Sequence, residues 1–116
     1  MQILAIILQV LLGLAFLGAG GQKLAASEEM VNDFERFGYP RWFLYATGAV
    51  EITGAIGMLA GIFVPLVGAL AGMWLAAVML GALFTHLRTK DSASKMVPAL
   101  VLLVLVLAVS TIHFFG

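Results

Sequence analysis

Four long apolar stretches dominate the sequence, with three shorter connections between them. The stretches run over about residues 3–24, 41–60, 63–87 and 97–115. Each comes close to the ~20 residues that an α-helix needs to cross ~30 Å of hydrocarbon. The pattern therefore predicts an all-α membrane protein, a bundle of four transmembrane helices that forms a single domain over residues 1–116.

The first connection contains the pattern of a short amphipathic helix. Ser27 can cap its start, and Gly38 with Pro40 ends it. Four apolar residues share one face at helical spacing: Met30, Val31, Phe34 and Phe37. We expect this helix to lie in the membrane interface as a structural lid, with its apolar side toward lipid or the mouth of the bundle. Docking of a partner is the alternative.

Prolines and small residues predict details of the longer helices. Pro65 and Pro98 are expected to open the third and fourth spans, where a missing N–H costs little, with 89–95 as a short polar turn. Three small-xxx-small pairs predict close helix packing, which in lipid depends on small side chains. They are Gly57 with Gly61, Gly68 with Gly72, and Ala77 with Gly81.

Composition and charge agree with the membrane assignment and add an orientation. The 116 residues are 63% hydrophobic and 10% charged, against about half and a quarter in soluble domains. All six basic residues lie in or beside the first and third connections: Lys23, Arg36, Arg41, Arg88, Lys90 and Lys95. This asymmetry predicts that both connections are cytoplasmic and both termini are outside, in the cell (inner) membrane. No basic residue precedes Lys23, so the first stretch is interpreted as a retained helix and not as a signal peptide.

The same counts exclude several functions. A net charge of zero gives no reason to expect a nucleic-acid partner, and the bilayer is the expected surroundings. The absence of cysteine excludes disulfides, thiolate nucleophiles and iron–sulfur clusters within this chain. His86 belongs to the cytoplasmic end of the third span and His113 to the outer end of the fourth, so the two should lie most of a bilayer apart and no metal site is expected.

Glu51 is the only Asp or Glu inside an apolar stretch, and a carboxylate at bilayer depth costs a few kcal/mol. Mostly small residues share its helix face: Leu44, Thr47, Gly48, Gly54, Ala55 and Met58. We therefore expect Glu51 to point into the bundle. Four others lie about 100° away and are expected to face lipid: Tyr45, Ile52, Ile56 and Leu59.

Depth along the helices suggests partners for Glu51. It lies ~15 Å from the start of its span at Arg41, and Gln9 falls within ~6 Å of the same depth. A Glu51–Gln9 hydrogen bond is therefore expected. Lys23 would have to reach inward, and His86 would need a water bridge or a tilted helix. Glu51 is either a structural carboxyl that fixes the helix register or a polar anchor or proton-handling group in a small cavity.

Several segments resemble the DoxX/DoxX-like family of small membrane proteins. Residues 13–24, which include Gln22 and Lys23, are similar to the end of that family's first helix. Residues 37–40 with 48–61, which include Glu51, resemble its second-helix signature, and 82–86, ending at His86, its third helix. The resemblance covers nearly the whole chain and implies a four-helix fold. Together with the depth argument for Gln9, it gives a candidate intramembrane polar site that consists of Glu51, Gln9, Lys23, His86 and Gln22.

The resemblance implies a function only in outline. The family's namesake is described as a membrane subunit associated with thiosulfate:quinone oxidation, and related animal proteins as receptor-assembly chaperones. Without cysteine for sulfur relay, an autonomous enzyme is not expected, and no catalytic residue is assigned. We expect an accessory or partner-binding subunit that contacts a membrane protein partner or a second copy of itself. The alternative is a redox subunit or carrier that binds a quinone or other small hydrophobic ligand; no other cofactor is indicated.

Overall fold

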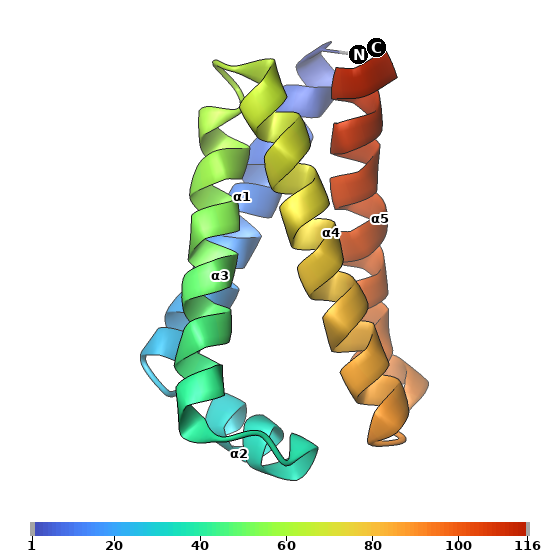
Figure 1. The fold of residues 1–116 in the computed structure, drawn as a ribbon. Coiled ribbons are helices and arrows are strands. Elements are labelled where there is room, and N and C mark those ends of the chain that lie inside the picture. The colour runs from blue at the N-terminus through green and yellow to red at the C-terminus, as the bar shows by residue number, and fades with distance from the viewer. Residues whose placement is uncertain (1, 116) are drawn as a thin grey trace.

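The computed structural model describes the backbone of residues 2–115 and the side chains of residues 2–112. This part of the chain forms five helices, which are α1 (Gln2–Leu24), α2 (Glu28–Phe37), α3 (Arg41–Ala60), α4 (Pro65–Arg88) and α5 (Ala93–Phe115) (Figure 1). All except α2 are long and apolar enough to cross a membrane. The predictions of an all-α fold, of four potential spans and of a short helix after the first span are confirmed.

The long helices run alternately up and down, and α2 lies across one end of the bundle (Figure 1). We call this end the α2 end, and the opposite end, where α1 begins and α5 finishes, the terminal end. The most extensive contacts join α1 to α3 and α4 to α5. The helices α3 and α4 meet near the terminal end and diverge toward the α2 end (Figure 1).

Glycines allow α3 and α4 to touch where they meet. A methyl group on Gly61 would collide with the Cα atom of Gly68. One turn deeper, a Cβ atom on Gly57 would lie 3.0 Å from the Cβ atom of Ala71. The two backbones therefore approach as closely as the small residues predict, and this crossing sets the point from which the helices diverge.

The other two small-residue pairs behave differently from each other. Gly72 packs against α5, where a methyl group would collide with Ser110 Oγ, and that hydroxyl donates to Ala69 O at 3.0 Å. Nothing lies within 4 Å of the position of a Cβ atom on Gly81. The prediction that Ala77 and Gly81 pack against another helix of this chain is wrong, because both line a cavity.

The signals at the ends of α2 act as predicted. Ser27 Oγ accepts a hydrogen bond from Met30 N at 3.3 Å, and Gly38 ends the helix with a φ of +84°. Phe34 and Phe37 are buried and pack with Leu44 of α3. The apolar side of α2, which was expected to face either lipid or the mouth of the bundle, therefore faces the mouth of the bundle.

Two predictions about the helices need correction. The helix α5 begins at Ala93, so Pro98 lies inside it and the polar turn ends at Ser92. A proline there removes one backbone hydrogen bond, and the Ser-Ala-Ser-Lys segment before it still forms the first turn. Ile52 and Leu59 do not face lipid, because they pack against Gly20 and Gly13 of α1.

The inward face predicted for Glu51 is otherwise confirmed. Thr47 is half-buried, and the other members are buried: Leu44, Gly48, Glu51, Gly54, Ala55 and Met58. Tyr45 and Ile56 are exposed, as expected for residues that face lipid.

Candidate functional site

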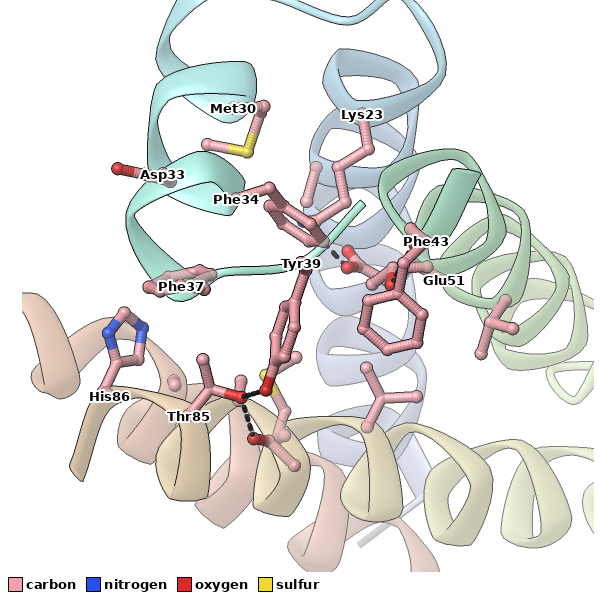
Figure 2. A pocket seen from close by; sticks show the side chains of 18 of the residues that line it. Lys23, Met30, Asp33, Phe34, Phe37, Tyr39, Phe43, Glu51, Thr85 and His86 are labelled. Carbon is pink, nitrogen blue, oxygen red and sulfur yellow. Dashed lines mark hydrogen bonds and ion pairs between the residues drawn. The ribbon is translucent and has the colours of Figure 1, made fainter. Parts of the chain in front are cut away.

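A buried ion pair joins α1 to α3. The Nζ atom of Lys23 lies 2.8 Å from Oε1 of Glu51, and the two side chains are 14% and 3% exposed. Both side chains line the same cavity (Figure 2). The structure thus places Glu51 inside the bundle, as expected, but with Lys23 as its partner.

The packing of α1 on α3 explains how Lys23 reaches Glu51. A Cβ atom on Gly20 would lie 2.8 Å from Gly48 O, and one on Gly48 would lie 2.9 Å from Gly20 O and from Lys23 Cβ. These two glycines therefore lie opposite each other in antiparallel helices. Lys23 and Glu51 each follow a glycine by three residues, in opposite directions, so their Cα atoms are ~9 Å apart along the helix axes. Two long side chains can span that distance.

The same register shows why the expected Glu51–Gln9 hydrogen bond is wrong. With residue 20 opposite residue 48, Gln9 lies ~12 Å along the axis from the level of Glu51. Gln9 Nε2 donates to Met58 O at 3.1 Å, and its Oε1 is buried without a partner among the described residues. The expectation counted depth from the start of each helix, whereas α1 ends above the level at which α3 begins (Figure 1).

A cavity of about 620 Å³ lies between α3 and α4 on the α2 side of their crossing. All five helices contribute to its wall, which is mostly apolar. Phe43 and Phe84 line it and are 37% and 65% exposed, so the cavity opens between α3 and α4 on the side where lipid would lie. Ala77 and Gly81 have no large side chains, so they leave space along this part of α4.

Aromatic side chains close the cavity at the α2 end (Figure 2). They come from α2, from the connection after it and from α3, and adjacent ring centroids lie 5.0–6.3 Å apart. The cluster consists of Phe34, Phe37, Tyr39 and Phe43. The cavity therefore has an aromatic wall at one end and an ion pair in its side.

Charged groups attach α2 to the end of α4. The Asp91 carboxylate accepts a hydrogen bond from Arg36 Nη1 at 2.6 Å and contacts His86 Nδ1 at 2.5 Å. We call these three residues the α2 latch. The hydrogen bond from His86 and the charge of Arg36 hold the pKa of Asp91 below its usual value. His86 lines the cavity, but its partner is Asp91. The water bridge or tilted helix that would let His86 contact Glu51 is therefore not needed.

Two further contacts support the latch. The Tyr39 hydroxyl and Thr85 Oγ1 share a hydrogen bond of 2.8 Å, and Arg88 Nη2 donates to Phe37 O at 2.7 Å. The bond with Thr85, together with Arg88, lowers the pKa of Tyr39 below its usual 10.0. Figure 2 shows the Tyr39 ring reaching from the connection after α2 to Thr85 on α4.

The structure brings only part of the predicted site together. Lys23, Glu51 and His86 line one cavity, whereas Gln9 lies deeper and Gln22 is exposed on α1. The His113 side chain lies outside the described residues. Sequence reasoning missed Tyr39 and Asp91. The available signals were that Tyr39 is a polar residue beside the amphipathic helix and that Asp91 is an acid among basic residues.

Comparison with known proteins assigns the chain to a family. The model of the DoxX-like family matches residues 7–109. The chain belongs to the DoxX-like family. A curated relative, the uncharacterized protein YdgD of Bacillus subtilis (strain 168), is 31% identical over 102 residues, which cover 87% of this chain and 90% of that protein. No solved structure matches.

The DoxX-like match covers most of each long helix and includes the ion pair, the cavity and the α2 latch. Together with four apolar helices of sufficient length, it indicates a multi-pass membrane protein. The relative adds no activity, because it is uncharacterized. The function of this DoxX-like chain is therefore inferred from the geometry of its site.

Proposed function

We propose that this DoxX-like protein binds a small, largely apolar molecule within the membrane, with the polar end of the molecule at Lys23 and Glu51. The observation that carries the proposal is the ion pair in the wall of an open cavity. Its volume, about 620 Å³, lies within the ~300–1,000 Å³ typical of small-molecule sites, which are mostly apolar with a few polar groups.

The position of the ion pair favours binding over a purely structural role. A buried pair contributes little net stability, because desolvation offsets the attraction of the charges. A pair that only fixed the α1–α3 register would be sealed between the two helices. Lys23 and Glu51 instead face a space large enough for a ligand.

In this proposal the protein acts as a carrier or as an accessory subunit that presents the molecule to a membrane partner. A quinone or its reduced form, a quinol, is one molecule of this kind, and any chemistry performed on the bound molecule belongs to the partner. The α2 end carries the basic residues and is proposed to face the cytoplasm, with both termini outside the cell membrane.

Mass spectrometry of lipid extracts from the purified protein tests the proposal. Gly81→Leu should fill the cavity, because open space surrounds that position. Gly18→Leu is the matched control, since its position is also open but does not line the cavity. We expect a stoichiometric small molecule in the wild type and in Gly18→Leu, and its loss in Gly81→Leu.

Two results would contradict the binding function. One is a wild type that carries no such molecule and takes up none when small apolar compounds are added. The other is a molecule that Gly81→Leu retains fully. Crosslinking in membranes that recovers a partner equally with wild type and Gly81→Leu would then support docking alone.

A further inference from the structure

We infer that the molecule held in the cavity is neutral and carries a hydroxyl group, as in a phenol or an alcohol with an apolar body, and that this hydroxyl lies between Lys23 and Glu51. The inference rests on the proposed function and names the ligand class of the same site. It follows from the hydrogen-bonding capacity, the charge and the surroundings of the pair.

The ion pair has unused donors and acceptors. An ammonium has three N–H donors and a carboxylate about four acceptor positions, and the pair uses one of each. Among residues 2–112, neither side chain has another polar partner. Among the described residues, Gln9 Oε1 is the fully buried side-chain polar atom that has no hydrogen-bond partner. The oxygen atoms of Glu51 are not fully buried in this way, because Glu51 lines the cavity. A ligand can therefore receive a hydrogen bond from Lys23 and donate one to Glu51.

Charge disfavours ionised ligands between Lys23 and Glu51, although Asp33, His86 and Lys95 also line the cavity. Lys23 and Glu51 are neutral as a pair, wherever the proton between them lies. A ligand carboxylate or amine would add a net charge to a mostly apolar site at membrane depth, which is costly. The ligand that fits is neutral.

Hydrogen bonding then selects among neutral groups. A ketone, ester or ether only accepts, so it satisfies Lys23 but places an oxygen beside the Glu51 carboxylate without a proton between them. A hydroxyl both donates and accepts, and it can therefore bond to both residues at once. The pair therefore favours alcohols and phenols over ketones, esters and ethers.

The rest of the cavity suits the apolar part of such a molecule. Aromatic rings of Phe34, Phe37, Tyr39 and Phe43 form its end wall (Figure 2), and the small residues Ala77 and Gly81 leave room along α4. The opening between α3 and α4 allows an amphiphile to enter from lipid, with its hydroxyl leading toward the ion pair.

Matched probes test the inference in nanodiscs by isothermal titration calorimetry, with empty nanodiscs as the blank. The probes are 4-heptylphenol, its methyl ether and 4-heptylbenzoate. A hydrogen bond to a charged group contributes enough for about tenfold to hundredfold tighter binding. We expect the phenol to bind more tightly than the ether by that factor, and the benzoate to bind most weakly.

A double variant, Lys23→Met with Glu51→Leu, removes both charges together and leaves neither unpaired. We expect it to bind phenol and ether equally. Equal binding of both probes by the wild type, or tightest binding of the benzoate, would overturn the inference. If the wild type bound both probes equally and Gly81→Leu abolished this binding, the inference would fail but the proposed binding function would stand. If no probe bound to the wild type, both the inference and the proposed function would fail.

Discussion

Replacing Lys23 by methionine should destabilise the bundle, because it leaves the Glu51 carboxylate without a partner. The Nζ and Oε1 atoms are 2.8 Å apart, and the Glu51 side chain is 3% exposed. Removal of one member of a buried pair costs about 3–5 kcal/mol. Since the cavity is open on one side and Lys23 is partly exposed, we expect the lower end, about 3 kcal/mol.

The free energy of unfolding can be measured by titration with dodecyl sulfate in mixed micelles, using the fluorescence of Trp42 and Trp74. Lys90→Met is the control, because Lys90 is exposed in the connection between α4 and α5. Its effect should stay within about 0.5 kcal/mol. Glu51→Gln should cost less than Lys23→Met, since a lysine near the end of α1 can turn toward the interface.

The double variant, Lys23→Met with Glu51→Gln, separates the ion pair from other contributions. It leaves no unpaired charge, so we expect it to be more stable than Lys23→Met alone, with a coupling energy of about 2 kcal/mol. If Lys23→Met behaved like Lys90→Met, or if the two substitutions were simply additive, the reasoning about this pair would be refuted.

Three further predictions concern the helix crossing and the closure of the α2 end. Gly61→Ala should cost about 1–3 kcal/mol, because the added methyl collides with α4, whereas Gly18→Ala should stay within about 0.5 kcal/mol in the same titration. Asp91→Asn should weaken the attachment of α2 to α4, which would broaden the distribution of distances between spin labels on these two helices. Because the chain has no cysteine, one cysteine introduced on each helix gives unique labelling sites. Because the pKa of Asp91 is lowered in the folded protein, its carboxylate stabilises the attachment of α2 at pH values above the usual aspartate pKa of 3.8. This contribution is lost as pH falls through the folded-state pKa, and a distribution that broadens already near pH 6 would contradict it.

The helices could be predicted because each depends on residues close together in sequence. The long apolar runs indicate four spans, and Ser27 and Gly38 mark the ends of α2 through local hydrogen bonding and a left-handed backbone. The start of α5 was misplaced because proline is most favourable in a first turn, yet a helix of 23 residues tolerates one at its sixth position.

The partners within the site could not be predicted, because they depend on how far one helix slides along another. That register comes from the contact of Gly20 with Gly48, and a pattern on one helix does not reveal which glycine it meets on the next. A difference in register of about one helical turn, between the ~6 Å expected and the ~12 Å found for Gln9, exchanges Gln9 for Lys23 as the partner of Glu51. Asp91 was missed for a related reason, since its partner Arg36 lies on α2, which only the fold brings to the end of α4.

The bundle consists of two helix pairs, α1 with α3 and α4 with α5. The crossing at Gly61 and Gly68 joins these pairs near the terminal end. A small rotation of one helix pair relative to the other about this crossing would hardly move the two glycines, but it would change the distance between α3 and α4 where the cavity opens. At the α2 end, α2 and the connection after it join the two helix pairs, through Arg36 with Asp91 and through Tyr39 with Thr85. In a membrane, we therefore expect the width of the cavity to depend both on the lateral pressure of the lipid around the α2 end and on the contacts that join the two helix pairs there.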